Sequence, residues 1–183
     1  MQNQTVTQIP LPRESSVREV YPATNLADAF AIALPPGTTG DPEVLARFIF
    51  AQTSRWISGL MAVRDAIVGP FGLKTSGQLK MNGDAGPQRV GIFRIYGTTA
   101  HEIILGEDDS HLDFRLSVLH QMHPSQPATC PPRLIISTVV HCHNALGRAY
   151  IFVIAPFHRL IVQSMLRRAA RAGWPGENPI VQG

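Results

Sequence analysis

The segment HEIILGEDDSHLDFRLSVLHQ, residues 101–121, has a clear β-hairpin pattern. Its second half alternates apolar and polar side chains, which is typical of a β-strand with one buried face. Its first half pairs back across the acidic turn at 107–110. RVGIFRIYG (89–97) precedes the pair and RLIISTVVHCH (133–143), rich in β-branched residues, follows it. Together these segments predict an antiparallel meander.

Helical patterns lie on both sides of the meander. ADAFAIAL (27–34) predicts a first strand, and DPEVLARFIF (41–50) then begins with Asp41 as an N-cap and a proline at the first helical position. RWISGLMAVRDAIV (55–68) predicts a second short helix. The segment from Asn144 to Gly173 predicts a long C-terminal helix, which Pro156 should kink or split.

The order of elements sets the fold class. One strand, two short helices, a meander and one long helix favour α+β, because helices and strands are segregated along the chain. The last helix carries an apolar stripe that includes Tyr150, Val153 and Phe157, and this stripe should cover one face of the sheet. We expect one domain over residues 25–175, a flexible N-terminal arm over 1–24 and a tail over 176–183.

Charge and apolar runs limit the partners. A net charge of +3 with 16% charged residues is too mild for a nucleic-acid-binding surface. The longest uncharged apolar run, residues 149–157, is shorter than the roughly 20 residues that span a bilayer. Cys130 and Cys142 make no disulfide framework, and the N-terminus lacks a signal-peptide pattern. We therefore expect a cytoplasmic protein without a membrane span.

Three segments carry a resemblance: RVGIFRIY (89–96), LGEDDSHLDFRLSV (105–118) and HNALGRAYIFVIAPFHRLIVQSMLRRA (143–169). Over residues 25–172 the chain resembles a bacterial domain family of unknown function in the START-like superfamily, also called SRPBCC or birch-pollen-allergen type. The resemblance implies a helix-grip fold, in which a curved antiparallel sheet wraps around the long kinked C-terminal helix. Some members carry an NAD-binding domain, but no G-x-G-x-x-G follows a strand here, so we expect no cofactor.

The superfamily also implies a hydrophobic cavity between the sheet and the last helix. We therefore predict a domain that binds a small hydrophobic or amphipathic molecule, since such sites are mainly apolar with a few placed polar groups. Arg94, Tyr96 and Arg115 are candidate anchors for a polar end. The other candidate ligand-binding residues are Phe93, Phe114, Leu116, Tyr150, Val153 and Phe157. The family has no assigned reaction, so no catalytic residue is carried over.

The hairpin strand leaves the direction of its polar face open. Leu112, Phe114 and Leu116 share one face, and Asp113 and Arg115 share the other with His111. The polar face either forms a salt-bridged outer surface or points inward to hold a polar ligand group. The acidic turn lacks the residue spacing of a calcium-binding loop.

An enzyme is the alternative to a binding domain. A cyclase or hydrolase would use Asp113, His141 or His143 as general acid or base in the same cavity. Cys142 would need a lowered pKa to act as a nucleophile. A metal site at His141 and His143 would need a third ligand from elsewhere, such as His158 or Asp113, and no metal-binding motif supports it. A second alternative is an interaction protein without a ligand.

Two further features remain open. His158 and Arg159 follow Pro156, where a kink can free a backbone carbonyl for His158 or a ligand, although a simple helix bend also explains the proline. The strand at 133–143 is apolar on both faces, which predicts a second covered surface. Either a homodimer contact or the folded-back N-terminal arm would cover it.

Overall fold

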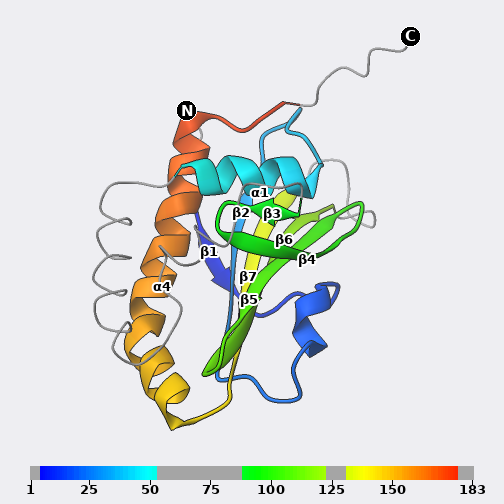
Figure 1. Ribbon diagram of the computed structural model, residues 1–183. Helices are drawn as coiled ribbons and strands as arrows, with labels where there is room; N and C mark the ends of the chain where they lie inside the picture. The colour runs from blue at the N-terminus through cyan, green and yellow to red at the C-terminus, as the bar shows by residue number, and fades with distance from the viewer. Residues whose placement is uncertain (1–4, 53–87, 123–130, 177–183) are drawn as a thin grey trace.

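The computed structural model describes residues 5–52, 88–122 and 131–176 as an α+β fold (Figure 1). A seven-stranded antiparallel sheet has the order β1-β2-β7-β6-β5-β4-β3. The strands are β1 (Thr7–Ile9), β2 (Leu26–Ala33), β3 (Arg89–Val90), β4 (Phe93–Thr98), β5 (Glu102–Asp108), β6 (Leu112–Gln121) and β7 (Arg133–Cys142). The helices are α1 (Pro42–Ala51), α4 (Ala145–Ala172) and the short 3-10 helix η1 (Ser16–Glu19).

The predicted meander is confirmed, because β4, β5, β6 and β7 are consecutive neighbours in the sheet. β2 joins it by pairing along its whole length with β7, from Leu26 opposite Val140 to Ala33 opposite Arg133. The strand before the helices therefore lies beside the last strand of the chain. The second predicted helix, 55–68, and Cys130 lie outside the described residues.

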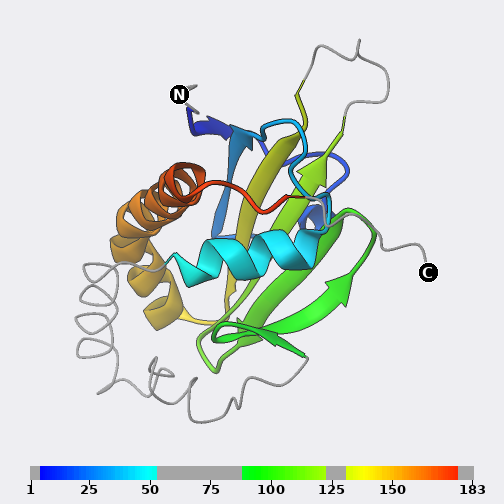
Figure 2. The ribbon, with the colours of Figure 1, turned by 90° about the horizontal axis from the view of Figure 1, so that it is seen from above.

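Both helices cover the same face of the sheet (Figure 2). The helix α1 begins as predicted, since Asp41 Oδ1 accepts hydrogen bonds from the backbone N–H groups of Glu43 at 2.8 Å and Val44 at 3.2 Å. The core between helices and sheet is made of buried aliphatic side chains and one phenylalanine. Its members include Phe30, Ile32, Leu45, Ile49, Ile103, Leu105, Leu116, Val118, Leu134, Ile136 and Leu166.

The N-terminal segment covers part of the opposite face. β1 pairs with β2, and Val17 in η1 is buried to 1% exposure. Ile9 and Leu11 pack against a small outer cluster made of Ala29, Ala31, Leu119 and Ile135. The folded-back arm thus accounts for the second apolar face of β7, where a homodimer contact was the other explanation.

The long helix α4 starts at the predicted cap, because Asn144 Oδ1 accepts a hydrogen bond from Gly147 N at 2.9 Å. Pro156 lies inside one continuous helix and does not split it. The buried side chains of α4 are Gly147, Ile151, Val162, Met165, Leu166 and Ala169. The prediction that the stripe with Val153 and Phe157 faces the sheet is wrong, because these side chains are 56% and 44% exposed.

The reason for that error is that α4 is apolar on two sides, and periodicity cannot choose between two apolar faces. Among the described helices, α4 is long and apolar enough to cross a membrane by length and composition. Its most apolar 18-residue window has a mean hydropathy of 1.4, and 22% of that window is buried. The prediction that the chain has no membrane span therefore stays a prediction.

Candidate functional site

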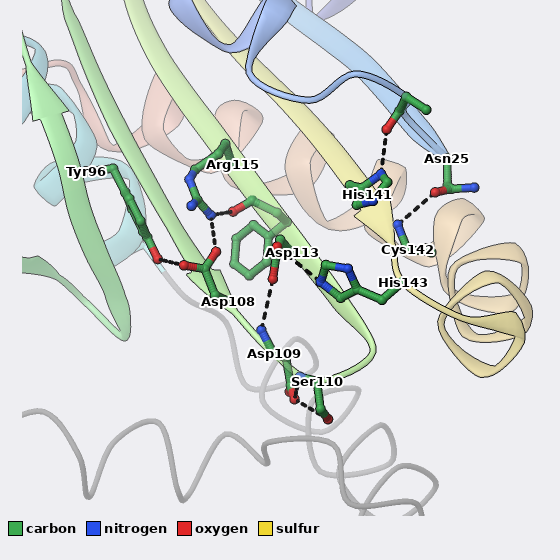
Figure 3. A network of polar contacts seen from close by, with 12 residues as sticks. Asn25, Tyr96, Asp108, Asp109, Ser110, Asp113, Arg115, His141, Cys142 and His143 are labelled. Carbon is green, nitrogen blue, oxygen red and sulfur yellow. Dashed lines mark hydrogen bonds and ion pairs between the residues drawn. The ribbon is translucent and has the colours of Figure 1, made fainter.

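The polar side of the β5–β6 hairpin lies on the outer face of the sheet, away from α1 and α4 (Figure 3). Arg115 Nη1 donates a hydrogen bond to Asp108 Oδ1 at 2.7 Å, and His143 Nε2 lies 3.1 Å from Asp113 Oδ2. Of the two directions open from the sequence, the outer one is therefore observed for Asp113 and Arg115.

Arg115 is enclosed by aromatic rings on this outer face. Its guanidinium carbon lies 3.6 Å from the ring centroid of Tyr96 and 5.8 Å from that of Tyr21. A β-bulge between Ile95 and Gly97 accompanies Tyr96, whose hydroxyl donates to Asp108 Oδ2 at 2.8 Å. Burial raises the pKa of Tyr21 and of Tyr96 to about 12. The Arg115 side chain is only 12% exposed, so this cation serves the protein's own structure.

The residues expected to catalyse a reaction lie on the same outer face. The His141 ring stacks on Tyr21 with centroids 5.6 Å apart, and its Nδ1 lies 2.7 Å from the Ala23 carbonyl oxygen. Cys142 points to the helix side and is buried, which raises the pKa of its thiol and disfavours a nucleophilic thiolate. In the described part of the chain, no three His, Cys, Asp or Glu side chains gather as metal ligands.

The predicted ligand-binding residues fall into three separate places. Three of them lie on the helix side of the sheet, namely Phe93, Phe114 and Leu116. Three lie on the outer face, namely Arg94, Tyr96 and Arg115. Tyr150 packs on the cluster around Leu112 and Cys142, whereas Val153 and Phe157 are exposed on α4. The nine residues therefore do not form one site.

A polar cluster that the sequence analysis missed lies between the sheet and α4. Asp28 on β2 stands directly opposite Thr138 on β7, and both are 4% exposed. Asp28 Oδ1 lies 3.4 Å from His158 Nε2, and Arg159 Nε donates to Asp28 Oδ2 at 3.4 Å. Two strands and one helix thus bring a carboxylate, a hydroxyl, an imidazole and a guanidinium together.

This cluster is short of hydrogen bonds. Asp28 Oδ1, Thr138 Oγ1 and His158 Nε2 are buried, and none of them has a hydrogen-bond partner among residues 5–52, 88–122 and 131–176. Buried polar atoms are nearly always paired, and an ionised carboxylate has about four acceptor positions. The side chain of Asp28 is 1% exposed, and its ion-pair contacts with the described residues His158 and Arg159 are both 3.4 Å long. The cluster therefore has acceptor and donor capacity that the described residues do not use.

Local sequence explains how each residue reaches this place. Asp28 has the same strand parity as Phe30 and Ile32, so its side chain points into the core. His158 lies seven residues after Ile151 and four before Val162, on the buried side of α4. A charged residue on the apolar face of a strand was the available signal for Asp28. His158 and Arg159 had been singled out only through their place after Pro156.

The family comparison covers the elements that build the cluster. A family described as "Protein of unknown function (DUF2867)" matches residues 20–165 of the 183. The chain belongs to this family. Asp28, Thr138, His158 and Arg159 all lie within the DUF2867 match. Neither a curated protein nor a solved structure matches the chain.

Proposed function

We propose that this DUF2867 domain is a START-like domain that binds a small amphipathic molecule between the sheet and α4. The observation that carries the proposal is the buried Asp28 carboxylate, whose Oδ1 faces His158 and receives no close hydrogen bond from any described residue. The sheet order and the long C-terminal helix on one face are in keeping with a helix-grip arrangement. A polar group of the ligand would supply the missing hydrogen bonds.

An apolar row beside the cluster suits the rest of such a molecule. In the sheet, Leu26, Val140 and Phe114 stand opposite one another, one step along from Asp28 and Thr138 on the same face. Phe114 meets Phe93 edge to face at 5.6 Å between ring centroids, and Phe93 meets Phe50 at 5.3 Å. These half-buried rings offer a ligand apolar contact next to the polar cluster.

The chemistry of the cluster selects the polar group. Asp28 Oδ1 accepts hydrogen bonds only, Thr138 both donates and accepts, and Arg159 already offers positive charge to the carboxylate. A hydroxyl or amine on the ligand can donate to Asp28 and accept from Thr138 or His158, whereas a carboxylate would meet like charge. We therefore expect hydroxyl- or amine-headed ligands to be preferred over acids.

The test uses three alkyl probes of equal chain length: 1-decanol, decylamine and decanoate. Binding is measured by displacement of the uncharged fluorophore N-phenyl-1-naphthylamine from the full chain. We expect the alcohol or the amine to displace the fluorophore best. Asp28→Asn should lower the affinity of that alkyl probe about tenfold, which corresponds to the loss of one hydrogen bond to a charged group. Asp113→Asn, on the outer face, is the matched control and should leave displacement unchanged.

Two results would overturn the proposal. One is equal loss of probe binding in Asp28→Asn and Asp113→Asn with both proteins folded by circular dichroism. The other is an absence of displacement by all three probes together with no co-purifying small molecule in native mass spectrometry, which would favour an interaction protein. Thr138→Val serves as a second variant if Asp28→Asn does not fold.

An enzyme of the hydrolase type is the second candidate, and one observation favours a particular version of it. The carboxylate–imidazole pair between the sheet and α4 is Asp28 with His158, rather than any pair among Asp113, His141 and His143 on the outer face. Such a pair can move a proton to or from a bound group. Hydrolysis of p-nitrophenyl decanoate by the wild type that is lost in His158→Gln would support an enzyme. Binding of this ester without hydrolysis would indicate a ligand carrier.

A further inference from the structure

The side of α4 that faces away from the sheet exposes large apolar side chains. Phe152 is 85% exposed, Val153 56%, Phe157 44% and Leu160 57%. The opposite side carries the buried residues of the helix, among them Ile151 and Val162. Among the described residues, the core uses one side of α4 and leaves the second apolar side exposed, and contiguous exposed apolar surface of this kind marks an interaction site.

The charged side chains of α4 are all positive. The helix contains no aspartate or glutamate, and its charged side chains are Arg148, Arg159, Arg167, Arg168 and Arg171, all exposed. Val153, Phe157, Leu160, Ser164, Arg167 and Arg171 follow one another at helical spacing, so they form one line along the helix. We call the exposed apolar residues and the arginines that continue this line the outer stripe of α4.

We infer that the outer stripe of α4 binds the surface of an anionic lipid bilayer. A helix that lies in a membrane interface buries apolar side chains at the boundary of the acyl chains and offers cations to anionic headgroups. Phe152 and Phe157 would enter the interface, and Arg167 and Arg171 would contact lipid phosphates. The opposite side of α4 packs on the sheet, with Leu166 and Ala169 at 0% exposure, so the helix lies along the bilayer and does not cross it.

A second copy of the chain fits the outer stripe less well. Two copies of α4 packed in parallel would bring Arg167 and Arg171 of both copies together, and packed antiparallel would set these arginines against apolar side chains. In neither orientation does α4 offer an acidic side chain to pair with them. An anionic surface, in contrast, matches both the apolar and the basic part of the stripe. This inference does not depend on the ligand proposed for Asp28.

The test is cosedimentation of the full chain with vesicles of phosphatidylcholine alone or of phosphatidylcholine and phosphatidylglycerol in equal amounts. We expect binding to the anionic vesicles that weakens in high salt. Arg167→Gln with Arg171→Gln should lower the partition coefficient on anionic vesicles about thirtyfold. Phe152→Gln with Phe157→Gln should lower the partition coefficient at least as strongly, because binding needs both the apolar contact and the charge attraction.

The matched controls replace apolar and basic side chains that lie outside α4. Val44→Gln with Met122→Gln replaces apolar residues that are 41% and 60% exposed outside α4. Arg13→Gln with Arg47→Gln removes two exposed arginines outside α4. Both double variants should bind anionic vesicles within about twofold of the wild type, a change that two unrelated surface sites rarely exceed.

Three outcomes would overturn the inference. Equal binding to neutral and anionic vesicles would remove the role of the arginines. Loss of binding in the control variants would show that any change of surface composition is sufficient. If the wild type does not bind either kind of vesicle, the outer stripe does not bind a lipid surface. Light scattering would then show whether the chain is a dimer that Phe152→Gln with Phe157→Gln dissociates, or a monomer.

Discussion

Glu102 Oε2 accepts a hydrogen bond from the Ser16 hydroxyl at 2.6 Å, across 86 positions of sequence. Its other oxygen accepts from the hydroxyls of Ser15 at 2.7 Å and Ser117 at 2.6 Å. Glu102 is 4% exposed, so a buried carboxylate on β5 holds the start of η1 on the outer face of the sheet. Because the charge is fully paired by hydroxyls and a backbone N–H, it stabilises the docked arm.

Glu102→Gln should loosen the N-terminal segment. The amide carries no charge, and its NH2 group would face the serine hydroxyls that donate to the carboxylate. We expect this change to lower the free energy of unfolding by about 2–4 kcal/mol. Hydrogen exchange should rise most in residues 7–19. Glu43→Gln on α1 is the control, because its carboxylate pairs with Arg47 at an exposed site. Unchanged exchange in the N-terminal segment would show that Glu102 does not hold it.

Gly147→Ala should separate α4 from the hairpin. A Cβ at Gly147 would lie 2.3 Å from the backbone oxygen of His111, which cannot move without shifting the β5–β6 turn. We expect a loss of about 1–3 kcal/mol in the free energy of unfolding, measured in urea. At Gly97 a Cβ meets nothing within 4 Å, so Gly97→Ala should be neutral or slightly stabilising. Equal effects of the two substitutions would contradict the close contact.

The burial of Tyr21 and Tyr96 predicts that both phenols ionise late, although the nearby Arg115 acts in the opposite direction. Burial raises the pKa of Tyr21 and Tyr96 from 10.0 to about 12, so the folded state favours the neutral phenol. Their contribution to stability is therefore complete below pH 10.0 and is lost as the pH rises towards about 12. An ultraviolet titration of tyrosinate should lose its late phase in Tyr21→Phe with Tyr96→Phe. Ionisation of both groups near pH 10.0 in a folded protein would refute this.

Asp28→Leu should separate stability from binding. Asp28 is buried and has no close hydrogen bond within the described part of the chain, so an apolar side chain in its place removes a desolvation penalty. Arg159, 44% exposed, remains hydrated. We expect an unfolding free energy that is unchanged or higher by about 1–2 kcal/mol, while binding of decanol or decylamine is lost. Asp108→Leu is the contrasting variant and should destabilise, because Asp108 accepts from both Arg115 and Tyr96. Strong destabilisation by Asp28→Leu would assign Asp28 a purely structural role.

Local pattern determined most of the strands and the helix ends. The alternation Leu112, Asp113, Phe114, Arg115 predicted which side chains share a face, and the register with β7 agrees with it. The caps Asp41 and Asn144 were predictable because a capping side chain bonds N–H groups only two or three residues away. Periodicity and capping are short-range effects, so a single sequence carries them.

The candidate site could not be predicted in the same way. Asp28 and Arg159 are 131 residues apart, and only the pairing of β2 with β7 and the packing of α4 bring them together. The sequence showed an acidic residue among apolar ones at Asp28 and a histidine after Pro156, but nothing local connects the two. Long-range pairs of this kind depend on which surfaces bury each other.

Side-chain period and hydrogen bonding along the chain are enough to predict the α+β class, the meander and a long apolar C-terminal helix. Which side of α4 meets the sheet, and that the N-terminal segment covers the outer face of β7, became known from the packing of distant segments. The physical reason is that both apolar sides of α4 gain from burial, and the fit of Gly147 and Ile151 against the sheet selects one.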